Sequence, residues 1–128
     1  MRSVATGILI ILAFLNGLLA SAQTLKEAYD EYNAAIALLE TDKAAAIQQF
    51  EKAVSLCEAI GPEADSLKMG IVGNLPSLYY DLAYDSYKNK KMEEALARFQ
   101  KTVEVAKKYG DEKTQKKAKM LSLSSIMP

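Results

Sequence analysis

A repeated segment constrains this chain more than any other feature. Residues 46–68 (AIQQFEKAVSLCEAIGPEADSLK) align with residues 95–117 (ALARFQKTVEVAKKYGDEKTQKK) at a constant separation of 49 positions. The aligned pairs are Ala46 and Ala95, Phe50 and Phe99, Lys52 and Lys101, Val54 and Val103, Gly61 and Gly110, Glu63 and Glu112, and Lys68 and Lys117. Upstream, residues 32–35 align with residues 80–83 at a separation of 48. Self-similarity of this kind predicts one supersecondary unit used twice.

Each copy reads as a pair of helices. An alanine stands four residues before a phenylalanine, so the small side chain and the ring share one helix face. The apolar spacing is three and four residues almost throughout, and the Asn16-Gly17 pair lies in the N-terminal segment rather than between strands. We therefore expect an all-α fold of antiparallel helical hairpins that interlock by ridges and grooves. The predicted structural core is Ala46, Phe50, Ala83, Ala95 and Phe99.

The second copy resembles a known family of helical repeats. Its residues Tyr79-x2-Leu82-Ala83-x2-Ser86, followed by Ala95-x3-Phe99, resemble the tetratricopeptide (TPR) pattern W-x2-L-G-x2-Y…A-x3-F…P. Thr102 and Lys107 replace the later alanine and proline, and the spacing exceeds the family's repeat of about 34 residues. The resemblance covers nearly all of the chain after residue 23. It implies a short TPR-like solenoid with extended helices, whose first helices line a concave groove.

The first 22 residues differ from the rest of the chain. Arg2 precedes an apolar run, residues 7–20, and Ala20-Ser21-Ala22 has the small-x-small pattern of a cleavage site. These features predict a secretory signal peptide cleaved before Gln23, and hence a periplasmic or secreted protein. The alternative is an uncleaved membrane anchor, because residues 4–22 are just long enough to span a bilayer. Asn16 and Gly17 interrupt the run and favour cleavage.

Residues 23–128 form the predicted repeat domain. We expect hairpin one at about 25–60, hairpin two at about 76–109 and a terminal helix at about 112–124. The predicted boundary signals are a capping box at Thr24 to Glu27, a cap at Thr41 or Asp42, Gly61 in a left-handed conformation before Pro62, and Gly110-Asp111. Pro76 predicts a kink or break near Asn74-Leu75 in the long region from Glu63 to Asn89.

The composition excludes several classes of chemistry. The chain has no histidine, no tryptophan and a single cysteine, Cys57. A His/Cys metal site, an intrachain disulfide and a Ser/His or Cys/His catalytic pair are thereby excluded. The acidic pairs Glu93-Glu94 and Asp111-Glu112 stand at expected helix starts, where the positive end of the helix dipole stabilises a carboxylate. This position gives both pairs a structural role. We predict a protein without enzymatic activity or cofactor.

Cys57 lies on the apolar stripe of its helix, three residues after Val54 and seven after Phe50. A free cysteine in such a place behaves as a small buried hydrophobe. The alternative is a reactive or intermolecular thiol, and alkylation of the native protein distinguishes the two.

Tyrosines give the most specific indication of function. Tyr80, Tyr84 and Tyr87 recur at helical spacing and form one stripe, as do Tyr29 and Tyr32 with Ile36 and Leu39. The resemblance implies that the positions of Tyr80, Tyr84, Tyr87 and Lys88 face a ligand. The alternative is that these rings only pack against the helix pair. Tyr79 lies on the opposite side from Tyr84 and is interpreted as structural.

Charge is unevenly distributed along the chain. Residues 23–85 contain 4 basic and 11 acidic side chains, a net charge of −7, whereas residues 86–128 contain 11 basic and 5 acidic ones, a net charge of +6. The acidic half and the predicted export argue against a nucleic-acid partner. Membrane binding by the lysine-rich last helix is disfavoured, because its apolar face is weak. The charge asymmetry is compatible with head-to-tail self-association.

The sequence thus predicts an exported interaction module that binds a peptide or protein segment on its first-helix groove. The alternative is an extracytoplasmic sensor segment of a longer signalling protein, anchored by residues 4–22. Met127-Pro128 stands near the place where Leu75-Pro76 precedes the second hairpin. Either the last helix caps the stack, or the sequence is the front of a longer array.

Overall fold

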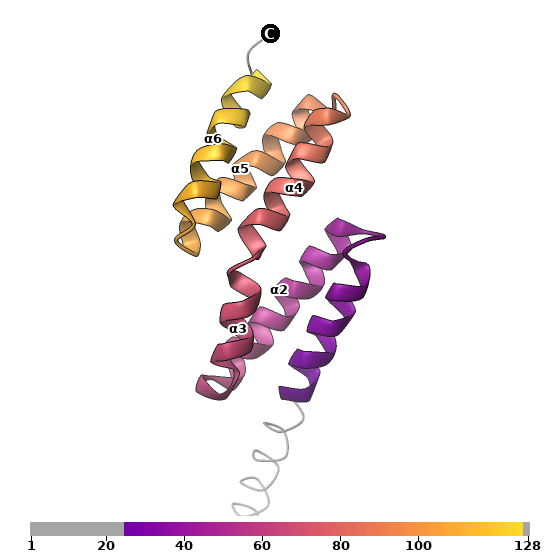
Figure 1. The fold of residues 1–128 in the computed structure, drawn as a ribbon, viewed down its shortest axis with the longest axis vertical. Helices are drawn as coiled ribbons and strands as arrows, with labels where there is room; N and C mark the ends of the chain where they lie inside the picture. The colour runs from indigo at the N-terminus through magenta and orange to yellow at the C-terminus, as the bar shows by residue number, and fades with distance from the viewer. Residues whose placement is uncertain (1–24, 127–128) are drawn as a thin grey trace, which may run out of the picture.

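The computed structural model describes residues 25–126, and all regular structure in this range is helical (Figure 1). The helices comprise a first helix at residues 25–38, α2 at Lys43–Ile60, α3 at Asp65–Val72, α4 at Leu75–Lys88, α5 at Met92–Lys108 and α6 at Glu112–Ile126. A short 3-10 helix, Pro62–Ala64, precedes α3. The all-α prediction is confirmed for this part of the chain. The predicted signal peptide, Thr24 and Met127-Pro128 lie outside the described residues.

Aspartates begin two of the helices. The Asp42 carboxylate accepts a hydrogen bond from the backbone N–H of Ala45 at 3.0 Å, and Asp111 accepts one from Thr114 at 3.0 Å. Each satisfies a first-turn donor that has no partner within its helix. The first helix ends at residue 38. There the Leu38 carbonyl accepts from the N–H groups of Thr41 and Asp42, which turns the chain into α2.

The long third helical region is broken between α3 and α4. The break lies at Gly73-Asn74, two residues before Pro76 and next to the predicted place near Asn74-Leu75. Pro76 stands in the first turn of α4, where its missing N–H is not needed. The Asn74 side chain donates to the Gly70 carbonyl at 3.0 Å and holds the connection. α4 begins at Leu75, and this leucine is buried.

One glycine follows the second helix of each hairpin, Gly61 after α2 and Gly110 after α5. Gly110 has φ +74°, and Gly61 has φ +93° with ψ −148°. The positive φ predicted for Gly61 is observed, but its ψ of −148° lies outside the left-handed helical region, so the predicted conformation is wrong. Gly61 instead occupies an extended region at positive φ that is open essentially to glycine alone. This conformation directs the chain into the 3-10 turn that begins at Pro62.

The helices form two packed groups joined through α4. The first helix, α2 and α3 make the lower group in Figure 1, and α4, α5 and α6 make the upper group. Leu75 belongs to the core cluster that contains Ile47, Phe50 and Val54 of α2. Leu78, Tyr79 and Leu82 of α4 pack against the same cluster. The start of α4 therefore attaches the second group to the first.

The repeated positions have matching environments. Ala46, Phe50, Ala83, Ala95 and Phe99 are all buried, as is Ala35, the counterpart of Ala83. The rings of Tyr32 and Phe50 lie 5.8 Å apart with an interplanar angle of 58°. Their counterparts, Tyr80 and Phe99, have the same separation and the same angle. The sequence duplication is therefore also a duplication of packing geometry.

Candidate functional site

Three tyrosines of α4 form a continuous row, which we call the tyrosine row. Tyr80 and Tyr84 stack with centroids 6.1 Å apart and planes within 7°, and Tyr84 and Tyr87 stack at 6.2 Å and 16°. Tyr80 and Tyr87 each contact Phe99, at 5.8 Å and 6.4 Å. Tyr84 is 38% exposed, and its two neighbours are half-buried. Phe99 thus contacts the two end rings of the row, and the middle ring, Tyr84, is the most exposed of the three.

Two lysines lie over the faces of this row. The Lys88 ammonium is 5.2 Å from the centroid of the Tyr84 ring, and the Lys117 ammonium is 4.5 Å from that of Tyr80. Both distances fall in the range of cation–π attraction, which contributes about 0.5–1 kcal/mol at exposed sites. Burial raises the pKa of Tyr80, and the nearby Tyr84 and Asp81 act in the same direction. Its phenol therefore remains protonated and able to donate a hydrogen bond.

A hollow of about 500 Å³ lies beside the tyrosine row, between α4 and α6. Its lining residues are Tyr80, Tyr84, Lys117, Met120, Leu121, Leu123 and Ser124. We call it the α4–α6 hollow. Apolar side chains from α6 and aromatic rings from α4 form its walls, with Lys117 as the charged group. A concave, mostly apolar surface with a few polar groups is typical of ligand sites.

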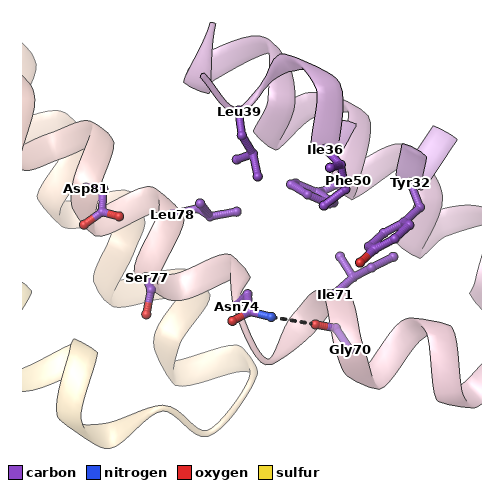
Figure 2. A pocket seen from close by; sticks show the side chains of 10 residues that line it. All are labelled: Tyr32, Ile36, Leu39, Phe50, Gly70, Ile71, Asn74, Ser77, Leu78 and Asp81. Carbon is purple, nitrogen blue, oxygen red and sulfur yellow. Dashed lines mark hydrogen bonds between the residues drawn. The ribbon is translucent and has the colours of Figure 1, made fainter. Parts of the chain in front are cut away.

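A second hollow, of about 340 Å³, lies between the first helix and the α3–α4 connection (Figure 2). We call it the first-helix hollow. Its lining residues are Tyr32, Ile36, Leu39, Phe50, Gly70, Ile71, Asn74, Ser77, Leu78 and Asp81. Tyr32 lines it, whereas Tyr29 is 48% exposed and lies outside the lining. The predicted residues Tyr29 and Tyr32 therefore belong to a different part of the face from the tyrosine row.

The two hollows occupy equivalent places in the two repeat units. Tyr32 and Ile36 correspond to Tyr80 and Tyr84 at a separation of 48. Across each hollow, Ile71 and Asn74 correspond to Met120 and Leu123 at a separation of 49. Each hollow therefore lies between the first helix of one unit and the helix that follows that unit. The chain presents the same groove twice, once with Tyr32 and Ile36 and once with Tyr80 and Tyr84.

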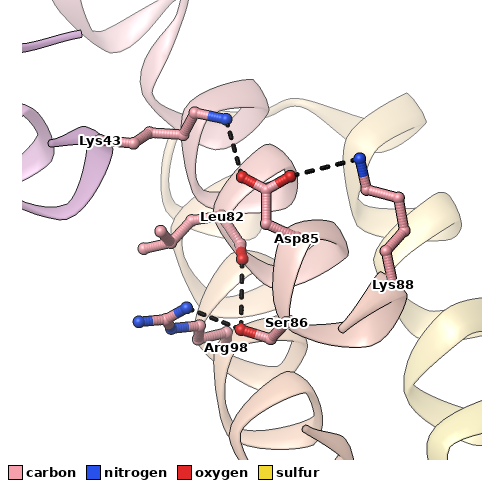
Figure 3. Close-up of polar contacts among 6 residues, drawn as sticks. All are labelled: Lys43, Leu82, Asp85, Ser86, Lys88 and Arg98. Atoms are coloured by element: carbon pink, nitrogen blue, oxygen red, sulfur yellow. Dashed lines mark hydrogen bonds and ion pairs between the residues drawn. The ribbon is translucent and has the colours of Figure 1, made fainter. Parts of the chain in front are cut away.

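An ion-pair network holds Lys88 beside the row (Figure 3). The Lys43 ammonium contacts the Asp85 carboxylate at 3.0 Å, and Lys88 contacts the other oxygen of Asp85 at 3.5 Å. The hydrogen bond from Lys43 lowers the pKa of Asp85 below its ordinary value, although partial burial opposes this effect. Asp85 thereby connects the start of α2 with the end of α4.

A second polar cluster lies under the turn between α4 and α5. The buried Ser86 hydroxyl donates to Glu94 at 3.0 Å and accepts from the Arg98 guanidinium at 2.6 Å. Glu94 also pairs with Arg98 at 3.5 Å. One member of each acidic pair named in the sequence analysis is therefore engaged. Glu94 binds Ser86 and Arg98, and Asp111 caps α6. Both carboxylates have structural partners.

Sequence reasoning missed the contribution of α6. Lys117, Met120, Leu121 and Leu123 line the α4–α6 hollow, although no residue of this helix was predicted to contribute to the groove. The available signal was the spacing of 117, 120, 121 and 124, which places these positions on one helix face. That this face meets the tyrosine row is a consequence of tertiary packing between α4 and α6.

Within residues 25–126, no three His, Cys, Asp or Glu side chains gather closely enough to hold a metal ion. None of the helices in that range is long and apolar enough to cross a membrane. Comparison of the chain with protein families, curated proteins and solved structures found no match.

Proposed function

We propose that this chain is an exported, TPR-like interaction module that binds a peptide or protein segment on the face formed by the tyrosine row and the two hollows. The observation that carries the proposal is the tyrosine row itself. Tyr80 and Tyr87 each contact Phe99, Tyr84 stacks between them, and Tyr80 and Tyr84 line a hollow of about 500 Å³. Rings that served packing alone would not need this open, apolar neighbourhood.

The chemistry of the row suits a protein ligand. Tyrosine offers a large rigid surface and a hydroxyl at low cost in conformational entropy. Because the three rings already stack on one another and the two end rings contact Phe99, little further ordering is needed on binding, and pre-organisation of this kind increases affinity. Met120 and Leu123 are 70% and 63% exposed next to the row. Exposed apolar groups beside aromatic rings are typical of interaction sites.

The repeated groove supports the finer description of the fold. Each unit contributes a first helix whose inner stripe lines a hollow, and the following helix closes it. In a solenoid, successive units bury their faces against neighbours and expose one continuous concave surface. The proposed ligand is therefore an extended or helical segment that passes along both hollows. Export remains the expectation from residues 1–22.

A peptide selection tests the proposal directly. The chain has seven tyrosines and no tryptophan, so a tryptophan-containing peptide library gives a fluorescence signal by energy transfer from protein tyrosine to peptide tryptophan. We expect selected peptides to lose about tenfold or more in affinity on Tyr84→Ala, as for a central aromatic anchor. Met92→Ala is a matched control, because Met92 is 40% exposed and lies outside both hollows.

Two results would count against this function. Peptides whose affinity is equally insensitive to Tyr84→Ala and Met92→Ala would not bind on the tyrosine row. A selection that yields no peptide at all, from a protein with native helical content, would also contradict the proposal.

A further inference from the structure

The outer surface of the first helix differs from the equivalent surface of α4. On α4, Leu75, Leu78 and Leu82 pack against the core cluster of the preceding hairpin. The residues 48 positions earlier are Glu27, Asp30 and Ala34, and all three are exposed. Glu27, Asp30, Ala34 and Ala37 lie on one stripe of the first helix, which we call the acidic edge. Acids and small alanines thus occupy the face that α4 uses for burial.

The opposite end of the molecule presents a basic, apolar surface. Leu123 borders both the α4–α6 hollow and another hollow of about 360 Å³, which Gln100 and Val103 of α5 help to line. Leu123 is 63% exposed and lies on the side of α6 opposite the buried Thr114 and Ala118. Lys116, Lys119, Met120 and Leu123 share this side, and all are exposed. We call these four residues the α6 crest.

The two surfaces are complementary in charge. Residues 112–126 contain four lysines and one glutamate, a net charge of +3. Residues 25–38 contain Lys26 against Glu27, Asp30 and Glu31, a net charge of −2. Lys26 pairs with Asp30 at 2.9 Å and Lys52 with Glu31 at 3.3 Å, whereas Glu27 makes no ion pair with any of the described residues. Opposite potentials steer surfaces together and fix their register.

The surfaces are also complementary in shape. Met120 and Leu123 project from the α6 crest, whereas Ala34 and Ala37 leave the acidic edge without large side chains. Helices pack closely when large side chains of one fit between small side chains of the other. We propose that the α6 crest of one copy packs against the acidic edge of a second copy, so that the protein associates head to tail.

Because the two surfaces are unlike, this contact is heterologous. It forms open chains of copies unless the rotation between neighbours closes a ring. Met120 and Leu123 of the α6 crest also line the α4–α6 hollow, so a neighbour packed on the crest covers one wall of that hollow, whereas Lys116 and Lys119 do not line it. Self-association and peptide binding can therefore be separated by mutation.

Sedimentation velocity of the purified protein measures the association. We expect the weight-average mass to rise with protein concentration at low salt and to fall as salt is added. Raising the ionic strength from 0.1 M to 1 M shortens the screening length from about 10 Å to about 3 Å. A mass that stays monomeric at every concentration would overturn the proposal, and so would association that salt leaves unchanged.

Charge reversal identifies the surfaces. Lys116→Glu with Lys119→Glu, and separately Glu27→Lys with Asp30→Lys, should each weaken self-association about tenfold or more, because each brings like charges together. Mixing the two double variants should restore association, since each reversed surface then meets an opposite charge. Lys101→Glu with Lys108→Glu makes the same change in net charge on exposed positions of α5 and should leave the association intact.

These experiments show whether the α6 crest contacts a second copy of the chain or an anionic membrane. If the control reversal weakens association as much as the reversal on α6, or if the mixture stays monomeric, the surfaces are wrongly assigned. If the protein binds vesicles of anionic phospholipid through Lys116 and Lys119 but does not self-associate, the α6 crest is a membrane contact and the proposal fails. In every case circular dichroism verifies that the variants retain native helix content.

Discussion

The phenol of Tyr79 on α4 donates a hydrogen bond to the carboxylate of Glu51 on α2. Its ring packs against the core cluster that α2 and α3 build. Burial raises the pKa of Tyr79 far above its ordinary value, and the hydrogen bond to Glu51 and the charge of that carboxylate act in the same direction. Tyr79 thus connects the two packed groups, in agreement with its interpretation as a structural residue.

This contact predicts a loss of stability in alkali. A phenol whose pKa is raised in the folded state binds its proton more tightly there than in the unfolded chain. Its contribution is fully present below the unfolded pKa of about 10 and is lost as the pH rises toward the folded value. We expect the free energy of unfolding by urea to fall as the pH rises above about 10. Tyr79→Phe should flatten that slope.

Glu51→Gln provides the matched test of the cause. It keeps the acceptor near Tyr79 and removes the negative charge, so the alkaline loss should become smaller without disappearing. An unchanged slope in Tyr79→Phe would show that other groups control the alkaline transition.

The two ring pairs predict where the core is most sensitive. Tyr80 with Phe99 and Tyr32 with Phe50 have identical ring separations, and both phenylalanines are buried. Phe50→Ala and Phe99→Ala should each cost about 3–5 kcal/mol, from lost transfer energy and the cavity that remains. Ala95→Leu should cost about 1–3 kcal/mol, because Ala95 is fully buried in one cluster with Ala83 and Phe99 and has no room for a larger side chain.

Denaturant unfolding measures these costs. Leu123→Ala is the control, because Leu123 is largely exposed and its truncation should change stability little. Melting temperatures that stay unchanged in both Phe99→Ala and Ala95→Leu would contradict the assigned helix register.

Lys90 predicts a stabilising substitution. It adopts φ +61° in the turn between α4 and α5, where its N–H bonds to the Tyr87 carbonyl at 3.1 Å. A left-handed conformation costs an L-residue roughly 1–2 kcal/mol, and glycine avoids this cost but loses more entropy on folding. Lys90→Gly should therefore raise the free energy of unfolding by about 0.5–1 kcal/mol. Asn89→Gly, at φ −86°, should lower it in the same denaturant titration.

Much of the fold follows from local sequence patterns, whereas the site depends on contacts between distant helices. The duplicated alanine and phenylalanine fix the helix pairs, and Asp42, Asp111 and Pro76 mark their ends correctly. The tyrosine stripe is visible at a spacing of three and four. The position of Lys117 over Tyr80 is not, because no local pattern encodes how α6 docks on α4. The strained φ of Lys90 is equally invisible in a lysine-rich turn.

The ion pair between Lys43 and Asp85 predicts an acid-sensitive link between the two halves. The hydrogen bond from Lys43 lowers the folded pKa of Asp85. Such a carboxylate contributes stability above its unfolded pKa of about 3.9 and loses it as the pH falls through the folded value. Both side chains are partly exposed, so the contribution should be no more than about 1 kcal/mol.

Lys43→Met removes this pair and should lower the free energy of unfolding at neutral pH while reducing its decline in acid. Lys26→Met is the control, because its pair with Asp30 lies within one exposed helix. If the two variants lose the same free energy of unfolding at neutral and at acidic pH, the pair between Lys43 and Asp85 contributes no more than an ion pair within one helix.

Cys57 predicts a thiol that reacts only when the protein opens. It is 1% exposed and contacts Ala28 and Ala64, which places it between the first helix, α2 and the 3-10 turn. Burial raises the pKa of the thiol, which reduces the reactive thiolate further. Labelling by Ellman's reagent should therefore be about a thousandfold or more slower in the native protein than in urea. In a Cys57→Ala background, Ser55→Cys moves the thiol to an exposed position of the same helix and should react at once. Native labelling of Cys57 as fast as that control would mean that the thiol is not part of the core.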